Sequence, residues 1–496
     1  MVALRLFSLW SLTSILVLSL SIAPNTAQAT TGYFQIGHGA SSSAMGGASI
    51  SFFKGSISTV INPAGLLHID PSFEISLMGF LPQRGGDLDT FKLFGEAVSV
   101  ESENPFFLAP NIAANWSITP KLAVGVTFYS SGGMNTEYKT NLFHQAFSKP
   151  IGLFTAAAAG SLGLSGSGPK AEYVKSSLLN APHTDTLGVN LEQGVLAPSL
   201  AYKLNDQLNV GVSLLVGFQR FEAQGLGDFI AFSQSPLALT NNGYDYSMGF
   251  GARLGLSYSP RGWLRVGAVA SSKVYMSDFK RYEGLFADGG NFDIPAHMGL
   301  GASVKLSPVF TFSADLTRIM YEGVASISNP GPTTDQLLQG FQQSLLNGLN
   351  ARARGVAVPV NEGALNPLGS ADGYGFGWRS IWVAKVGTHY QARPDLDLML
   401  GYAYGQNPIQ QQDALFNLIA PAVVQHHITG GVSKRFKAHT LTLSYQHVLE
   451  SEVTSTYRAG PEATTELAGS PNLELGFDAR LWMAQQVVEL SYGYTF

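Results

Sequence analysis

Histidine, cysteine and acidic side chains build most catalytic and metal sites, and this chain offers few useful arrangements of them. It has ten histidines and no cysteine, which excludes thiolate metal sites and disulfides. His426 and His427 are adjacent, but neighbours on a strand point to opposite faces and do not chelate one ion together. No G-x-S-x-G or H-E-x-x-H motif occurs. We therefore expect no enzyme activity, no metal and no cofactor.

Composition narrows the class of protein further. Only 13% of the 496 residues are charged, about half of the roughly 25% that is usual in soluble domains. Glycine is abundant, with 55 copies, and aromatic residues make up 11%. The formal net charge is −5, so we expect no nucleic acid partner.

The first 29 residues have the pattern of a signal peptide. Arg5 precedes an apolar run from Leu6 to Ile22, and Ala27-Gln28-Ala29 forms an A-x-A cleavage site. We predict a signal peptide over residues 1–29. No later stretch has the length and apolar character of a transmembrane helix, which leaves a secreted β protein or an outer-membrane barrel.

Strands are predicted from strict alternation of apolar and polar or small residues, which has the period of a β-strand. The alternation is clear in "LNVGVSLLVGFQRF", "DLDLMLGYAYG" and "TLTLSYQHVLE". In a soluble sandwich the apolar face packs on a second sheet. In an outer-membrane barrel it faces lipid, and the polar face lines the lumen. Alternation alone leaves both architectures open.

The lengths of the connections between strands decide between a soluble sandwich and an outer-membrane barrel. Six short turns alternate with seven long connections, which are predicted near 82–105, 131–194, 222–244, 281–291, 323–377, 406–424 and 451–480. An even number of strands, short periplasmic turns and long external loops are typical of outer-membrane barrels. We predict an all-β protein, a 14-stranded antiparallel transmembrane β-barrel over residues 71–496, in the outer membrane of a Gram-negative cell.

The last strand, "QVVELSYGYTF", alternates up to the final residue, Phe496. Because a closed barrel has no free edge, this strand is expected to pair with the first one. A terminal Phe is also similar to what outer-membrane barrels generally show. That resemblance implies the outer-membrane assembly machinery as a partner.

Residues 30–70, between the signal peptide and the first strand, are rich in glycine, serine and alanine and contain no long alternation. Asn62 and Pro63 favour a turn, and Ala64 with the following glycine permits close packing. The segment is either a periplasmic tail or a plug in the lumen. A barrel of about 14 strands encloses a pore wide enough to need a plug if it is not to leak.

The stretches "ASSSAMGGASI" and "INPAGL" resemble the hatch of the long-chain fatty acid transporter family, the FadL-type proteins with their toluene-uptake relatives. The resemblance continues over the mature chain in "LAPSLAYKLNDQLNVGVSLLVGFQRFEAQGLGD", "FDIPAHMGLGASVKLSP", "LMLGYAYGQNPI" and "HHITGGVSKRF". It implies a barrel closed by a hatch over residues 30–70. It also implies a monomer that takes up hydrophobic small molecules passively, through an apolar pocket and a lateral exit into outer-membrane lipid.

The resemblance also implies functions for particular residues. Arg220 and Arg379 stand where the family has partners for the substrate head group. The alternative for each is a solvated or lumen-facing arginine that pairs with a nearby acid, such as Glu222. Tyr33 and Phe34 stand where the family has an aromatic residue near the mature N-terminus, so they either contact ligand or only pack. Asn62, Pro63 and Ala64 form the implied hatch motif.

Several substrates and functions remain open on the sequence. Long-chain fatty acids are the first expectation, and aromatic hydrocarbons or alkanes suit an apolar lumen as well. A general porin shares the barrel but would lack a plug and usually has a highly charged lumen, so the low charge argues against it. A purely structural barrel would hold no ligand in the lumen.

Overall fold

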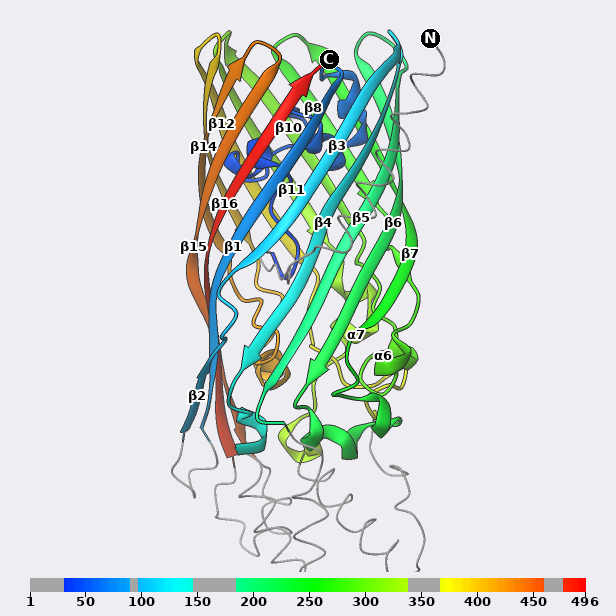
Figure 1. Cartoon of the computed structure of the whole chain (residues 1–496), viewed down its shortest axis with the longest axis vertical. Coiled ribbons are helices and arrows are strands. Elements are labelled where there is room, and N and C mark those ends of the chain that lie inside the picture. Colours follow the sequence, from blue (N-terminus) through cyan, green and yellow to red (C-terminus); the bar gives the residue numbers. More distant parts are fainter. Residues whose placement is uncertain (1–30, 90–96, 146–183, 338–365, 459–475) are drawn as a thin grey trace, which may run out of the picture.

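The computed structural model describes residues 31–89, 97–145, 184–337, 366–458 and 476–496. Within these residues, fourteen long strands form one closed antiparallel barrel (Figure 1). The all-β fold class and the predicted number of fourteen strands are confirmed. The predicted signal peptide over residues 1–29 lies outside the described residues.

The pairing order closes the barrel. β1 pairs with β3 on one side and with β16 on the other, and the β1–β16 register runs from Ser72↔Thr495 to Asp89↔Asp478. In the described part of the chain, β2 pairs only with β1 and β9 only with β7, so neither belongs to the fourteen. The last strand thus leaves no free sheet edge, as the alternation up to the C-terminus predicted.

The strands span β1 Ser72–Asp89, β2 Ala97–Glu101, β3 Phe107–Thr119, β4 Leu122–Tyr138, β5 Leu187–Lys203, β6 Leu208–Gln224, β7 Asp245–Arg261, β8 Leu264–Ser271, β9 Tyr275–Met276, β10 His297–Ser307, β11 Phe310–Ile319, β12 Ile381–Arg393, β13 Leu396–Gly405, β14 His426–Phe436, β15 His439–Arg458 and β16 Gly476–Thr495. Short turns join them at the end that carries the C-terminus, and long connections lie at the other end (Figure 1). We call these the periplasmic and extracellular ends, after the topology of outer-membrane barrels.

The helices whose bounds both lie within the described residues are short. The first three precede the barrel, at α2 Ala40–Ala44, η1 Ile57–Val60 and η2 Pro63–Leu67, and the rest lie in the extracellular connections. Those are η3 Gly227–Phe232, η4 Pro236–Ala238, η5 Lys280–Tyr282, α6 Ala287–Gly290, η6 Tyr321–Gly323, α7 Ala325–Ser328, η7 Gln411–Asp413 and α9 Ala414–Asn417. No helix among the described residues is long and apolar enough to cross a bilayer.

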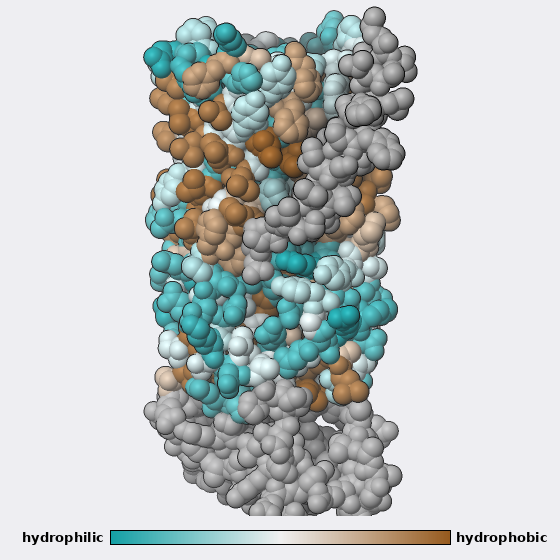
Figure 2. All heavy atoms as spheres, in the orientation of Figure 1, coloured by the Kyte–Doolittle hydropathy of each residue, from teal (hydrophilic) through white to brown (hydrophobic). Residues whose placement is uncertain are grey.

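Apolar side chains cover the outer face of the barrel in its periplasmic half. Figure 2 shows this belt in brown, above a hydrophilic surface nearer the extracellular end. Leu214 on β6, Leu400 on β13 and Leu490 on β16 are 49%, 67% and 52% exposed, and each lies on the apolar face that alternation predicted. Outward leucines around a closed barrel are stable only against lipid, so the periplasmic half spans the membrane.

Several strands run farther toward the extracellular end than the sequence predicted. β1 continues to Asp89, β4 to Tyr138 and β15 to Arg458, where long connections were predicted from 82, 131 and 451. Apolar alternation marks only the part of a strand that faces lipid. Beyond the belt the outward side chains are polar, although the backbone pairing continues, so these predicted strand ends are wrong.

Residues 31–71, which we call the luminal segment, lie inside the periplasmic half of the barrel (Figure 1, dark blue). Most of their side chains are buried. The segment contains α2, η1 and η2, joined by turns. This placement favours the plug over a periplasmic tail, while movement of the segment as a hatch stays a prediction.

Inward-facing polar side chains of the barrel hold the luminal segment. Glu489 on β16 accepts a hydrogen bond from Ser43 Oγ at 2.6 Å, and the Oγ of Ser491 accepts one from the Ala40 N–H at 2.9 Å. Further backbone N–H groups of the segment donate to other strands: Ile57 to Glu74 (3.0 Å), Ile50 to Asp315 (2.8 Å) and Gly46 to Thr429 (2.9 Å). Because buried polar groups are costly when unpaired, segment and wall stabilise each other.

Candidate functional site

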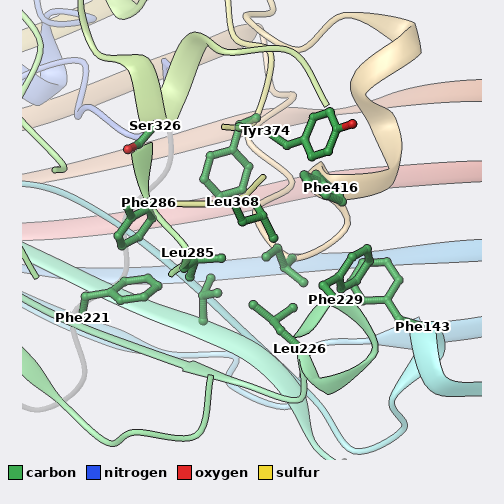
Figure 3. Close-up of a pocket in the computed structure, with 14 residues that line it drawn as sticks. Phe143, Phe221, Leu226, Phe229, Leu285, Phe286, Ser326, Leu368, Tyr374 and Phe416 are labelled. Carbon is green, nitrogen blue, oxygen red and sulfur yellow. The ribbon is translucent and has the colours of Figure 1, made fainter. Parts of the chain in front are cut away.

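An apolar pocket, which we call the outer pocket, lies among the extracellular connections. Inward side chains of β5 and β6 form one wall, and the connections after β4, β6, β8, β11 and β13 form the others. In Figure 3 the labelled aromatic and leucine side chains surround one common space. Six phenylalanines contribute to the lining: Phe143, Phe221, Phe229, Phe286, Phe376 and Phe416.

The outer pocket has the chemistry of a site for an apolar small molecule. About 530 Å³ of space lies between its lining residues, including the part that is open to solvent. None of its described lining residues is charged, and the hydroxyls of Ser326 and Tyr374 are the polar side-chain groups among them. Such a lining binds hydrocarbon by removing apolar surface from water.

A layer of four aromatic residues lies on the periplasmic side of the outer pocket. Its members are Tyr33, Phe292, Tyr321 and Trp378. The Tyr33 ring is fully buried, and its centroid lies 6.0 Å from that of Trp378, 5.8 Å from Tyr321 and 6.3 Å from Phe292. Trp378 and Phe292 in turn contact Phe376 and Phe286 of the outer pocket. Tyr33 is the contribution of the luminal segment to this layer.

A second space, which we call the inner cavity, lies between the luminal segment and the barrel wall. It encloses about 690 Å³, again including open space. Phe34 lines this cavity and its ring packs 4.8 Å from that of Tyr33, so the aromatic layer separates the two spaces. A ligand passing from the outer pocket to the inner cavity must displace part of that layer.

The Asn62-Pro63-Ala64 motif is packed against inward glycines of the wall. Asn62 donates to the backbone oxygens of Ile50 (2.8 Å) and Leu256 (2.9 Å) and accepts from the Ala64 N–H. A Cβ placed on Gly211 of β6 would lie 2.4 Å from the Ala64 nitrogen. Only glycine permits so close an approach of two backbones, so Gly211 allows the motif to pack directly against β6.

The barrel wall has a break between β3 and β4. These strands pair only from Asn111↔Tyr129 to Thr119↔Leu122, whereas β4 continues to Tyr138. Along the unpaired edge, Phe34 of the luminal segment forms an isolated antiparallel bridge with Gly132. The segment therefore takes the place of β3 over part of the break.

Arg84 on β1 spans part of the remaining break. The residue is 2% exposed, and its guanidinium donates to the Asn135 backbone oxygen at 2.6 Å and side-chain oxygen at 2.9 Å. It also donates to the Asn104 backbone oxygen at 3.0 Å. Nearer the extracellular end, the Glu103 N–H donates to the Glu137 backbone oxygen at 2.9 Å. Arg84 thus connects β1 to β4 at Asn135, between the bridge at Gly132 and the hydrogen bond at Glu137.

Arg84→Met is expected to loosen the wall at the break while the barrel stays folded. Each hydrogen bond contributes about 0.5–1.5 kcal/mol, so loss of two or three should raise local opening roughly 10- to 100-fold. Amide hydrogen exchange at residues 133–137 measures this. Arg318→Met is the control, because Arg318 lies on the outer face over the Trp382 ring. Equal exchange in both variants would show that Arg84 does not close the break.

The structure places Arg220 away from the outer pocket. It lies on the outward face of β6, where its Nη2 pairs with Glu192 Oε1 at 2.7 Å and its guanidinium stacks over the Tyr244 ring. The next residue, Phe221, points inward and lines the pocket. A ligand in the outer pocket therefore contacts Phe221 and not Arg220. The ion pair expected as the alternative is present, with Glu192 rather than Glu222 as its acid.

Arg379 lies just before β12 and is exposed. Burial raises the pKa of nearby Asp413, an effect that a hydrogen bond from the Gly331 N–H and the charge of Arg379 partly offset. Arg379 lines neither space, so a head-group role for Arg220 and Arg379 stays a prediction. Tyr33 lies in the aromatic layer and Phe34 lines the inner cavity; contact of either with ligand also stays a prediction.

Among the charged residues with interior positions that the sequence reasoning missed are three cations, Arg84, Arg253 and Lys385. The alternation of outward apolar residues indicates the interior position of two of them. Arg253 lies between outward Ala252 and Leu254, and Lys385 between outward Ala384 and Val386. A period of two therefore places both cations on the luminal face.

Comparison with known proteins agrees with this architecture. No protein-family model matches the chain, and no curated protein matches it. Among solved structures, the Pseudomonas putida toluene transporter TodX shares 19% identity with a TM-score of 0.57, covering 93% of this chain and 99% of that one. A Pseudomonas aeruginosa FadL homologue shares 14% identity with a TM-score of 0.58, covering 94% and 100%. The Ralstonia pickettii toluene transporter TbuX shares 18% with a TM-score of 0.51, covering 93% and 98%.

The chain has the FadL-type fold. The resemblance seen in the sequence is thus confirmed at the level of the fold. Together with the apolar belt of the closed barrel, this fold confirms the predicted location in the outer membrane. The solved structures compared above include two that are named as toluene transporters.

Proposed function

We propose that this protein carries hydrophobic compounds passively across the outer membrane. In this proposal the outer pocket captures the compound, the luminal segment moves as a hatch, and the break between β3 and β4 is the lateral exit to lipid. The observation that carries the proposal is a pocket with no described charge in its lining, on the extracellular side of a luminal segment that lies inside the barrel.

The shared fold supports this function. TodX and TbuX are toluene transporters, and the third similar structure is a FadL homologue. A general porin is the closest rival, but the luminal segment of this chain occupies the place of an aqueous channel. Diffusion of an apolar compound through packed aromatic layers requires no energy source beyond its concentration gradient.

The outer pocket recognises the hydrocarbon body of a substrate. Each buried CH₂ contributes about 0.8 kcal/mol, and phenylalanine rings pack equally well on an aromatic ring or an acyl chain. A carboxylate is costly to bury without a cation, and none of the described lining residues supplies one. Monoaromatic hydrocarbons and the acyl chains of long-chain fatty acids both fit the apolar lining of the pocket. The head group of an acid requires a polar partner elsewhere.

Phe416→Asp is expected to weaken capture of hydrocarbon. Phe416 is partly exposed beside the Phe229 ring, at 5.2 Å between centroids, so the change adds a charge to the lining without emptying the core. We expect toluene and oleate affinities of the purified protein to fall at least roughly tenfold, because ligand binding would desolvate the carboxylate. A titration with each ligand measures this.

Leu237→Asp is the matched control, since Leu237 is 93% exposed on η4. It should leave both affinities unchanged. Mass spectrometry of molecules that co-purify with the unchanged protein adds an independent readout. A protein that binds neither toluene nor oleate, carries no hydrophobic molecule and conducts ions would disprove the proposed function in favour of a porin.

A further inference from the structure

The periplasmic end of the barrel carries an excess of positive charge. Its six short turns, with the strand residues that flank them, are 119–122, 203–208, 259–264, 305–310, 393–396 and 434–439. They hold eight cationic side chains and two acidic ones, although the chain as a whole has a formal net charge of −5. Asp70 before β1 and the C-terminal carboxylate are further anions at this end, and the excess stays positive.

The cations surround the barrel instead of forming a patch on one side. Each of the six turns supplies at least one cation, and the turns follow one another around the closed sheet (Figure 1). We call these eight residues the periplasmic ring: Lys121, Lys203, Arg261, Lys305, Arg393, Lys434, Arg435 and Lys437. A partner that encloses the barrel on every side fits such a ring better than a partner that contacts one side.

Most of the ring is not neutralised by nearby acids. Asp206 pairs with Lys203 at 2.9 Å, and Asp395 pairs with Lys434 and, at 3.8 Å, with Arg393. The other five cations of the ring are exposed, and no carboxylate among the described residues forms an ion pair with them. Uncompensated charges of one sign attract a partner of the opposite sign.

Exposed apolar side chains lie directly beside the cations. Arg261 places its guanidinium 5.7 Å from the ring centroid of Trp263, which is 46% exposed. In three other turns a cation is followed at once by an exposed apolar residue, in Lys203-Leu204, Lys305-Leu306 and Arg435-Phe436. Aromatic girdles of outer-membrane barrels lie where the hydrocarbon of the bilayer meets its head groups. Long basic side chains beside them extend into the head-group layer.

We propose that the periplasmic ring binds the phosphate groups of net-negative phospholipids in the leaflet at this end of the barrel, while the adjoining apolar side chains contact their acyl chains. Guanidinium and ammonium groups both bind phosphate, the first as a planar fork and the second as a point charge. Free phosphate or a soluble acidic protein would leave the outward apolar side chains uncovered, whereas a lipid covers both kinds of surface. The inference rests on the position of the barrel in the membrane and not on the proposed transport function.

Two lipids that share their acyl chains and differ in the head group test this surface. The full-length protein is placed in vesicles of equal parts phosphatidylglycerol and phosphatidylcholine, and one lipid at a time carries brominated chains that quench nearby tryptophans. Trp382→Phe and Trp482→Phe form the background, so that Trp116 and Trp263, 38% and 46% exposed near the ring, report on this end. We expect phosphatidylglycerol to be favoured about fivefold in 0.1 M NaCl, the factor for one cation beside one anionic lipid. The preference should fall in 1 M NaCl.

A matched pair of variants assigns the preference to the ring. The first removes one exposed cation from each of four turns, with Lys121→Gln, Arg261→Gln, Lys305→Gln and Arg435→Gln. It should lower the preference below about twofold. The control removes two lysines and two arginines from the extracellular half, with Lys139→Gln, Lys280→Gln, Arg281→Gln and Arg458→Gln. It should keep the preference of the unchanged protein.

The proposal is wrong if the unchanged protein associates equally with both lipids, or if the two variants behave alike. Equal association would overturn it even if the first variant bound purified peptidoglycan more weakly, because the ring would then serve a different partner.

A second measurement does not depend on any variant folding. Phosphatidylglycerol with a photoreactive group in its head region is cross-linked to the unchanged protein in vesicles, and the modified peptides are identified by mass spectrometry. Cross-links are expected in the six periplasmic turns. Cross-links confined to the extracellular connections would contradict the proposal, and neither result would bear on whether the outer pocket captures hydrocarbon.

Discussion

Deleting residues 31–64 is expected to raise the single-channel conductance of the protein in planar bilayers by at least roughly tenfold. The deletion removes α2, η1 and the Asn62-Pro63-Ala64 motif from the lumen. It leaves inward serines, asparagines and carboxylates that water can solvate. Barrels of this size that lack a plug contain an aqueous channel.

The unchanged protein is the reference for this measurement and should conduct poorly. Retention of the barrel in the deletion variant can be followed by its β-sheet circular dichroism. An intact barrel with unchanged conductance would show that the luminal segment does not obstruct the pore. The interpretation of residues 31–71 as a plug would then have to be abandoned.

Gly211→Val is expected to displace the luminal segment without deleting it. A Cβ at this position would lie 2.4 Å from the Ala64 nitrogen and 2.5 Å from the Pro63 carbonyl carbon. Neither backbone atom can move away without the whole motif moving. Since valine is favoured in strands, β6 should still form. We expect conductance to rise toward that of the deletion and the segment to become sensitive to protease.

Gly262→Val provides a matched control for this substitution. Gly262 lies in the turn between β7 and β8, where an added Cβ meets no atom within 4 Å. Its conductance and protease resistance should equal those of the unchanged protein. If Gly211→Val behaves in the same way as Gly262→Val, the close packing of the motif on β6 has no part in keeping the lumen closed.

The sequence predicted the membrane-spanning part of the fold well because lipid imposes a simple rule. Each outward position in the belt must be apolar, so Leu398 and Leu400, or Leu441 and Leu443, mark their strands without ambiguity. On the extracellular side of the belt the outward face meets water, and this rule no longer applies. That is why β1 and β15 continue through residues predicted as connections.

The candidate sites were harder to predict because their residues come together only through the closed barrel. The outer pocket joins Phe143, Phe229 and Phe416, from three connections that are far apart in the sequence. The inner cavity joins β7 and β12 across the lumen. Arg220 was chosen by resemblance, although alternation with inward Phe221 places it on the outer face. Strand parity places other charged residues, Arg253 and Lys385 among them, on the luminal face.

The hydrogen bonds at the seam of the barrel have a consequence for the order of assembly. Glu489 and Ser491 of β16 bind Ser43 and Ala40, while Glu74 of β1 binds Ile57. The surface that binds the luminal segment is therefore complete only when the last strand has paired with the first. We expect closure of the barrel and binding of the segment to be coupled, because a chain whose last strand is not yet paired lacks part of that surface.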